Sequence, residues 1–152
     1  MIQQPGQALR QLLDEPEIIV APGAYDGLSA RLIEQAGFKA VYQTGAGTSA
    51  SVLGQPDIGL ITMPEMVNQA RNMVSVLDIP LMADADTGYG DVINVVRTVR
   101  EFERAGVAAV QLEDQVLPKR CGHLSGKQLV NTDVFVKKLN AAVNEKLYKD
   151  TV

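Results

Sequence analysis

Three acidic residues at the ends of apolar runs have the types and the spacing that could hold a metal ion. Asp84 and Asp86 stand two residues apart in ADADTGYG, so they lie on the same side of an extended chain and repel one another unless a proton or a cation lies between them. Glu113, near the end of VAAVQLED, could join them directly or through water. Such oxygen ligands suit Mg²⁺. An ordinary turn at Asp86 and an exposed strand end at Glu113 are the alternative interpretation.

The stretch QLEDQVLPKRCGHLSGK contains the only cysteine, Cys121, and the only histidine, His123. These two residues are too few for a zinc site unless acids or another chain contribute ligands. Lys119, Arg120 and His123 would favour the thiolate form of Cys121, which could act as a nucleophile or exchange a proton with a substrate. An exposed and inert thiol is the remaining alternative.

Two other segments offer polar groups that could bind a ligand. YQTGAGTSAS, residues 42–51, is rich in small residues whose backbone N–H groups could hold a carboxylate or a phosphoryl group. It lacks the Gly-Lys-Ser/Thr of a P-loop, and a flexible glycine-rich loop is an equally good interpretation. Asp57, in GQPDIG, could be a site acid, a helix cap or a turn residue.

The alternation of apolar and amphipathic runs predicts the parallel α/β fold that would position these residues. We expect strands at residues 17–26, 39–45, 79–86 and 107–114, and helices at residues 26–36, 63–77, 91–106 and 131–147. Near-continuous apolar strands suit a parallel sheet covered by helices. Functional groups in such folds gather at the carboxyl ends of the strands, which is where the candidate residues fall.

A repeated Ala-Gly pair indicates the length of one βα unit. The pair occurs at 36–37 and again 69 residues later at 105–106. Half of that separation is the unit length expected of a (β/α)₈ barrel, which typically needs ~250 residues. Four strands in 152 residues make about half of such a barrel. A small flavodoxin-like open sheet is the competing architecture at this point.

Composition bounds the class of protein further. The hydrophobic fraction of 46% suits one domain, covering residues 1–152, with a substantial core. The net charge of −4 argues against nucleic-acid binding, because phosphate recognition needs a basic face. The amino-terminal sequence does not resemble a signal peptide, and no apolar run approaches the ~20 residues of a membrane span. We therefore expect a cytoplasmic protein with no membrane partner.

Taken together, ADADTGYG, VQLEDQVLPKRCGH and YQTGAGTSAS resemble the isocitrate lyase/phosphoenolpyruvate mutase superfamily, most of all its 2-methylisocitrate lyase-type members. The likeness covers roughly residues 5–145. It implies a Mg²⁺-dependent TIM-type (β/α) barrel, of which this chain would be the N-terminal half, truncated before the fifth strand. The small-molecule substrate would be a carboxylate. In the family the later strands supply further substrate-binding groups, so either the chain is a truncated or degenerate product, or a homo-oligomer or a complementing chain completes the site.

The resemblance also assigns roles to individual residues. It implies that Asp86 is the principal metal ligand, that Asp84 and Glu113 reach the ion largely through water, and that Asp57 is an acid near the metal. The segment that would hold the substrate consists of Tyr42, Thr44, Gly45 and Ala46. A mobile lid would consist of Lys119, Arg120, Cys121, Gly122 and His123, with the cysteine as the proton donor.

The implied reaction is cleavage of a carbon–carbon bond in a 2-hydroxy di- or tricarboxylate such as 2-methylisocitrate, which releases an α-keto acid such as pyruvate. Cys121 favours this lyase branch. The alternatives are an oxaloacetate hydrolase, a carboxyphosphonoenolpyruvate phosphonomutase-type enzyme, or a catalytically inactive remnant. TGAGTSAS differs from the Ser-Gly-Gly form common among methylisocitrate lyases, so the particular substrate is left open.

Overall fold

Four short strands pair in parallel, in the order in which they occur along the chain. The computed structural model describes residues 4–152. Its sheet consists of β1 (Gly23–Ala24), β2 (Val41–Gln43), β3 (Leu81–Asp84) and β4 (Ala109–Gln111), in the order β1-β2-β3-β4. A doubly wound, flavodoxin-like sheet would place β1 between two later strands. The sequential order therefore excludes that alternative and is the order of strands in a barrel.

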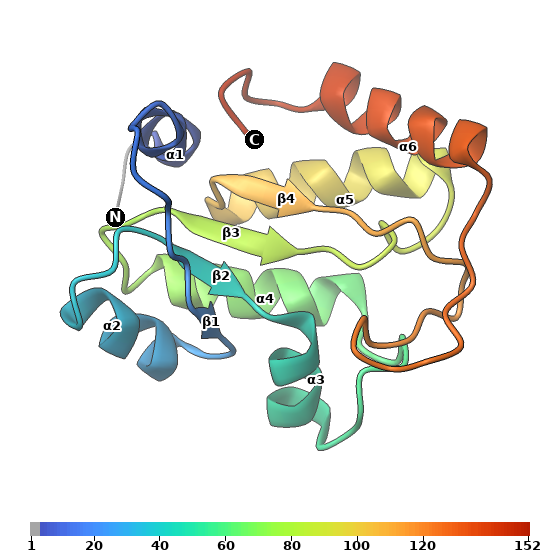
Figure 1. Cartoon of the computed structure of the whole chain (residues 1–152), viewed down its shortest axis with the longest axis horizontal. Coiled ribbons are helices and arrows are strands. Elements are labelled where there is room, and N and C mark those ends of the chain that lie inside the picture. The colour runs from blue at the N-terminus through green and yellow to red at the C-terminus, as the bar shows by residue number, and fades with distance from the viewer. Residues whose placement is uncertain (1–3) are drawn as a thin grey trace.

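The helices are α1 (Pro5–Leu13), α2 (Gly27–Gln35), α3 (Gly45–Leu53), α4 (Met63–Val74), α5 (Val92–Ala105) and α6 (Thr132–Glu145). Of these, α2, α4, α5 and α6 follow one another along one face of the sheet. Contacts run from α2 to α4, from α4 to α5 and from α5 to α6. In Figure 1 α4 and α5 lie behind the strands, whereas α1 lies toward the end at which the strands begin. No helix within residues 4–152 is both long and apolar enough to cross a bilayer.

Local sequence explains where the predicted helices begin and end. The Asp26 carboxylate accepts a hydrogen bond from the Ser29 backbone N–H at 2.7 Å, and Asp91 starts α5 with a similar capping box. Side-chain acceptors of this kind satisfy N–H groups that have no partner inside the helix. α5 ends at Gly106, whose φ of +93° is a left-handed conformation that glycine adopts readily.

The main core lies between the sheet and the helices. Leu81 and Ala83 of β3 point to this side and belong to one cluster with Met66, Met73 and Phe102. The next residues along the strand, Met82 and Asp84, point to the opposite face, as the two-residue period of a strand requires. A second, smaller cluster on that face consists of Leu9, Ala108 and Ala109, with Ile19 and Met82 packed against it.

The structure differs from the sequence-based expectations at three elements. The strand expected at residues 17–26 is only Gly23–Ala24, and Ile18 and Val20 before it are 89% and 57% exposed. The glycine-rich stretch after Thr44 forms α3 instead of a loop. α1 was not predicted. Thr44 explains α3, because its hydroxyl accepts the Gly47 N–H at 3.3 Å and caps a helix of otherwise weak helix formers.

The last residues of the chain extend the sheet beyond β4. Val152 donates its N–H to the Ala108 carbonyl and accepts the Val110 N–H, both at 3.0 Å, which is the pattern of a parallel pair. The buried Glu103 carboxylate holds this segment in place. It accepts hydrogen bonds from the Leu147 N–H at 2.7 Å, the Tyr148 N–H at 3.1 Å and the Thr151 hydroxyl at 2.8 Å.

Candidate active site at the carboxyl ends of the strands

The buried Asp84 carboxylate joins two of the predicted site segments, its own and the glycine-rich residues 42–51. It ends β3, and its two oxygens accept the Gly45 N–H at 3.1 Å and the Asp86 N–H at 3.0 Å. Gly45 is the first residue of α3, so Asp84 lies at the positive end of that helix. The close approach requires glycine, because a Cβ at Gly45 would lie 2.6 Å from an Asp84 oxygen. The backbone N–H of Gly45 therefore holds a carboxylate of the protein itself.

Asp86 has an unusual backbone conformation and a charged partner from a distant segment. Its φ of +47° lies in the left-handed region, which aspartate tolerates better than most residues. The Asp86 carbonyl accepts the Glu113 N–H at 2.7 Å, which links the ends of β3 and β4. One Asp86 carboxylate oxygen lies 2.5 Å from the Lys119 ammonium.

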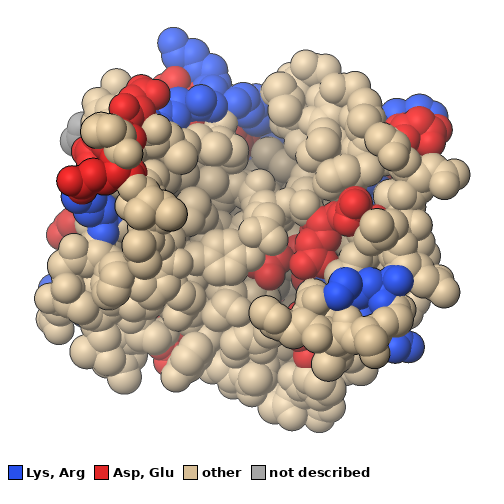
Figure 2. Space-filling model, viewed as in Figure 1, with Lys and Arg blue, Asp and Glu red and all other residues tan. Residues whose placement is uncertain are grey.

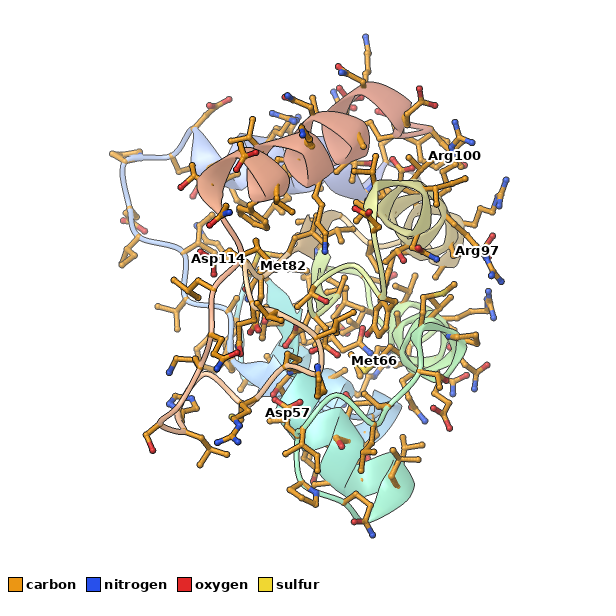
Figure 3. All side chains as sticks on the ribbon, turned by 90° about the vertical axis from the view of Figure 1, so that its right-hand side faces the viewer. Asp57, Met66, Met82, Arg97, Arg100 and Asp114 are labelled. Carbon is orange, nitrogen blue, oxygen red and sulfur yellow. The ribbon has the colours of Figure 1, made fainter. Side chains whose placement is uncertain are left out.

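Lys119 also pairs with Asp57, so its ammonium lies between two carboxylates. The distance to the Asp57 oxygen is 2.6 Å. The three side chains are almost fully buried, with exposed fractions of 1% for Lys119, 6% for Asp57 and 5% for Asp86. In Figure 3, which looks onto the carboxyl ends of the strands, Asp57 lies on the connection between α3 and α4. The structure thus brings Asp57 to the acids at the ends of β3 and β4.

The residues that follow Lys119 are less buried. We call residues 115–130 the Cys121 segment; Figure 1 shows it in orange beside the α3–α4 connection. The Cys121 N–H donates to the Asp57 carbonyl at 3.0 Å, and the Cys121 side chain is free and half-buried. Arg120 and His123 are exposed. Figure 2 shows acidic and basic side chains next to one another in this region, on the right of the view.

Burial among like charges perturbs the acids of the site. Burial, reinforced by the Asp84 and Asp57 charges, raises the pKa of Asp86 to about 6, although the Lys119 ammonium opposes this shift. Burial likewise raises the pKa of Glu113. For Lys119, burial alone would lower the pKa, but its pairing with Asp57 and Asp86 outweighs burial and raises it. The Lys119 ammonium therefore stabilises the charged form of the Asp57 and Asp86 carboxylates.

The other predicted substrate-binding residues surround Asp84. Tyr42, half-buried on β2, has its pKa raised by burial and by the Asp84 carboxylate. Thr44 uses its hydroxyl to cap α3, and Ala46 follows in the first turn of that helix, half-buried. Tyr42, Thr44, Gly45 and Ala46 therefore share one end of the sheet with the acids. Their contact with a substrate stays a prediction.

Two residues that connect the site were not identified from the sequence. Gln115 is buried; its side-chain N–H groups reach a Glu113 oxygen at 2.7 Å and the Arg120 carbonyl at 2.8 Å. Its position two residues after Glu113 is a signal that could have found it. Lys138, buried on α6, donates to the Thr87 carbonyl at 3.0 Å. Nothing in the local sequence distinguishes it from the exposed Lys137 beside it.

The carboxylate oxygens of the site are the kind of donor that a divalent cation binds. One oxygen each of Asp57 and Asp86 is buried with the Lys119 ammonium as its polar partner and with no other hydrogen-bond donor among residues 4–152. Hard oxygen donors that face a cation are what Mg²⁺ requires. Across residues 4–152, however, no three Asp, Glu, His or Cys side chains come together closely enough to form a metal site in this arrangement. The set Asp84, Asp86 and Glu113 stays a prediction.

The fold and the site together define a class of protein: a parallel α/β barrel segment with an acidic site at the carboxyl ends of its strands. The chain belongs to the phosphoenolpyruvate mutase/isocitrate lyase family, because residues 9–151 match the family model described as phosphoenolpyruvate phosphomutase. This match confirms the resemblance inferred from the sequence motifs.

Relatives of known activity are similar over nearly all of this chain. The chain is 53% identical to 2,3-dimethylmalate lyase of Eubacterium barkeri over 93% of its own length and 49% of the relative's. It is 50% identical to 2-methylisocitrate lyase of Aeropyrum pernix over 93% of its length and 46% of the relative's. The chain thus spans about half the length of the curated relatives it matches.

Solved structures confirm the type of fold. Oxaloacetate acetylhydrolase bound to 3,3-difluorooxalacetate matches with a TM-score of 0.90 and 49% identity, over 93% of this chain and 49% of that one. Phosphonopyruvate hydrolase bound to oxalate and Mg²⁺ matches with a TM-score of 0.88 and 35% identity, over 99% of this chain and 51% of that one. The predicted half-barrel architecture agrees with these matches.

Proposed function

We propose that this chain carries the metal- and proton-handling end of a Mg²⁺-dependent carbon–carbon lyase. The substrate would be a 2-hydroxy di- or tricarboxylate related to 2-methylisocitrate or 2,3-dimethylmalate. One observation carries the proposal: Asp57, Asp84, Asp86 and Glu113 gather at one end of the sheet with the segment that bears the lone cysteine. Identities of 53% and 50% to lyases acting on such compounds support it.

Asp86, with Asp84 and Glu113, would hold the Mg²⁺, which when bound stabilises negative charge developing on the substrate's 2-oxygen. Lys119 and Arg120 would offset the charge of the substrate carboxylates. The N–H of Gly45 and the half-buried Tyr42 would keep Asp84 in its orientation, because both lie against that carboxylate.

Cleavage of the carbon–carbon bond requires a proton donor for the carbanion that it forms, and Cys121 would be that donor. The bond between C2 and C3 breaks, its electron pair stays on C3, and the 2-hydroxyl loses its proton to a basic group of the site as C2 becomes a keto carbon. The Cys121 thiol then protonates the C3 carbanion. The backbone of Cys121 is already hydrogen-bonded to Asp57, one of the site acids, so a short movement of the side chain brings the thiol to this end of the barrel.

The test is release of an α-keto acid by the purified chain. 2-Methylisocitrate, 2,3-dimethylmalate and oxaloacetate should each be incubated with and without Mg²⁺, and pyruvate and oxalate should be measured. The mass of the chain in solution should be determined in the same samples, because a homo-oligomer or a complementing chain is the partner we propose for it. Mg²⁺-dependent pyruvate release from either hydroxy acid supports the lyase.

A second candidate is hydrolysis of oxaloacetate, which the similarity to oxaloacetate acetylhydrolase favours at a TM-score of 0.90. Oxalate formed from oxaloacetate, with no pyruvate from the hydroxy acids, would select that reaction. A folded chain that turns over none of the three compounds would instead support a catalytically inactive form.

A further inference from the structure

Lys119 occupies the position that a cation would take between Asp57 and Asp86. Its ammonium lies 2.6 Å from one carboxylate and 2.5 Å from the other. Within the part of the chain that the structure describes, no donor other than this ammonium forms a hydrogen bond to either oxygen. The ammonium alone therefore offsets their charge, in a place where burial makes an unpaired carboxylate costly.

A divalent cation could not share these oxygens with the ammonium. Two cations that contact the same carboxylate oxygens would lie only a few ångströms apart, and their repulsion is large in a buried site. Two further acids lie nearby: Asp84 has both oxygens bonded to backbone N–H groups, and Glu113 accepts the Gln115 amide N–H at one oxygen. A divalent ion that binds the Asp86 oxygen facing Lys119 therefore requires Lys119 to withdraw.

Withdrawal of Lys119 would free more than one side chain. The Cys121 segment is tied together internally: Val116 donates to the Gln128 carbonyl at 2.8 Å, and the Lys127 ammonium reaches the Leu124 carbonyl at 3.0 Å. Among residues 4–152, its polar contacts with the α3–α4 connection are the ion pair of Lys119 with Asp57 and the hydrogen bond from Cys121 to the Asp57 carbonyl. Loss of the ion pair leaves the backbone hydrogen bond of Cys121 as the polar contact between these two segments.

We propose that Lys119 is a resident cation that competes with the divalent metal for Asp57 and Asp86, so that metal binding releases the Cys121 segment. The inference rests on the magnesium site of the proposed function and specifies which residue of the chain controls access to it. The released ammonium is then available to pair with a carboxylate of the incoming substrate. Metal loading, movement of the segment and substrate capture are coupled through this one side chain.

The experiment measures metal affinity and backbone exchange instead of turnover. Mn²⁺ is titrated by calorimetry into the 152-residue chain, into Lys119→Met and into Lys119→Arg. Lys127→Met is the matched control, since it removes a lysine of the same segment whose ammonium donates to the Gly122 and Leu124 carbonyls. Lys119→Met should bind Mn²⁺ at least about tenfold more tightly, because a competing charge is gone. Lys119→Arg and Lys127→Met should stay close to the unmodified chain.

Hydrogen–deuterium exchange of residues 115–130 provides the second readout and needs no variant. Mn²⁺ should accelerate exchange there by several-fold in the unmodified chain, and it should change little in Lys119→Met, where the anchor is already missing. If Mn²⁺ binds and exchange in this segment is unchanged or slower, the competition is refuted while the metal site stands. If none of the four chains binds Mn²⁺, both the competition and the magnesium site of the proposed function are refuted.

Discussion

Replacing Gly45 by alanine tests the close packing of α3 against Asp84. The new Cβ would lie 2.6 Å from one Asp84 oxygen and 3.1 Å from its carboxyl carbon. The carboxylate cannot move aside freely, because it accepts the Gly45 and Asp86 N–H groups at 3.1 and 3.0 Å. Forcing an extra methyl group into such a site usually costs about 1–3 kcal/mol.

A gain in helix propensity opposes this cost. Alanine is favoured over glycine inside a helix by up to about 1 kcal/mol, so the net loss in the free energy of unfolding should be about 1–2 kcal/mol. For a chain of 152 residues this corresponds to a fall in melting temperature of roughly 2–8 °C.

Urea unfolding followed by circular dichroism measures the effect. Gly23→Ala is the matched control: its Cβ would lie 3.5 Å from Thr44, an ordinary contact, and we expect a change within about 0.5 kcal/mol. An unfolding free energy of Gly45→Ala equal to that of the control or of the unmodified chain would contradict the close packing of α3 against Asp84.

Three further predictions concern other contacts. Glu103→Ala removes three hydrogen bonds from the carboxyl-terminal segment. The substitution should lower the free energy of unfolding by about 2–4 kcal/mol and accelerate amide exchange at residues 147–152. Unchanged exchange at these residues would contradict the anchoring role of Glu103. The Ser29 N–H and hydroxyl lower the pKa of Asp26, so the cap should stabilise the fold above the unfolded pKa, and Asp26→Ala should cost about 1 kcal/mol near neutral pH. That difference should shrink as the pH falls through the lowered pKa, and a pH-independent difference in urea titrations would refute the assignment. Cys121→Ser should bind Mn²⁺ normally while α-keto acid release falls by about 10²–10⁴, and unchanged turnover would exclude the thiol as proton donor.

The sequence was sufficient for most elements because their patterns are strong and local. The apolar stripe of α5, its Asp91 cap and its Gly106 terminator predicted a helix at residues 91–106, and the structure has Val92–Ala105. The strands were placed correctly but are shorter than the apolar runs, since only part of each run finds a paired neighbour. Strand 17–26 illustrates this, because Ile18 has no neighbour that buries it.

What the sequence could not give depends on contacts between distant residues. α3 consists largely of small and polar residues, and it forms because Thr44 caps it and because Gly45 fits against Asp84, which lies 39 residues away. The sequence grouped Lys119 with a mobile lid, and only the three-dimensional arrangement shows its ammonium buried between Asp57 and Asp86. Asp84, Asp86 and Glu113 were expected at one edge of the sheet, because parallel strands bring their carboxyl ends together, and the structure has them there; their role as metal ligands stays a prediction.

The left-handed backbone at Asp86 restricts which mutations this position can accept. Asparagine would keep the φ of +47° comfortably but would remove the charge that faces Lys119. Glutamate would keep the charge but would bear the steric cost of that backbone conformation. The shape of the loop and its charge can therefore be lost separately, by two different single substitutions. Selection for the left-handed backbone alone would accept asparagine at this position, whereas selection for the negative charge alone would accept glutamate. A mutational scan that scores folding and metal binding in parallel would therefore distinguish the two requirements.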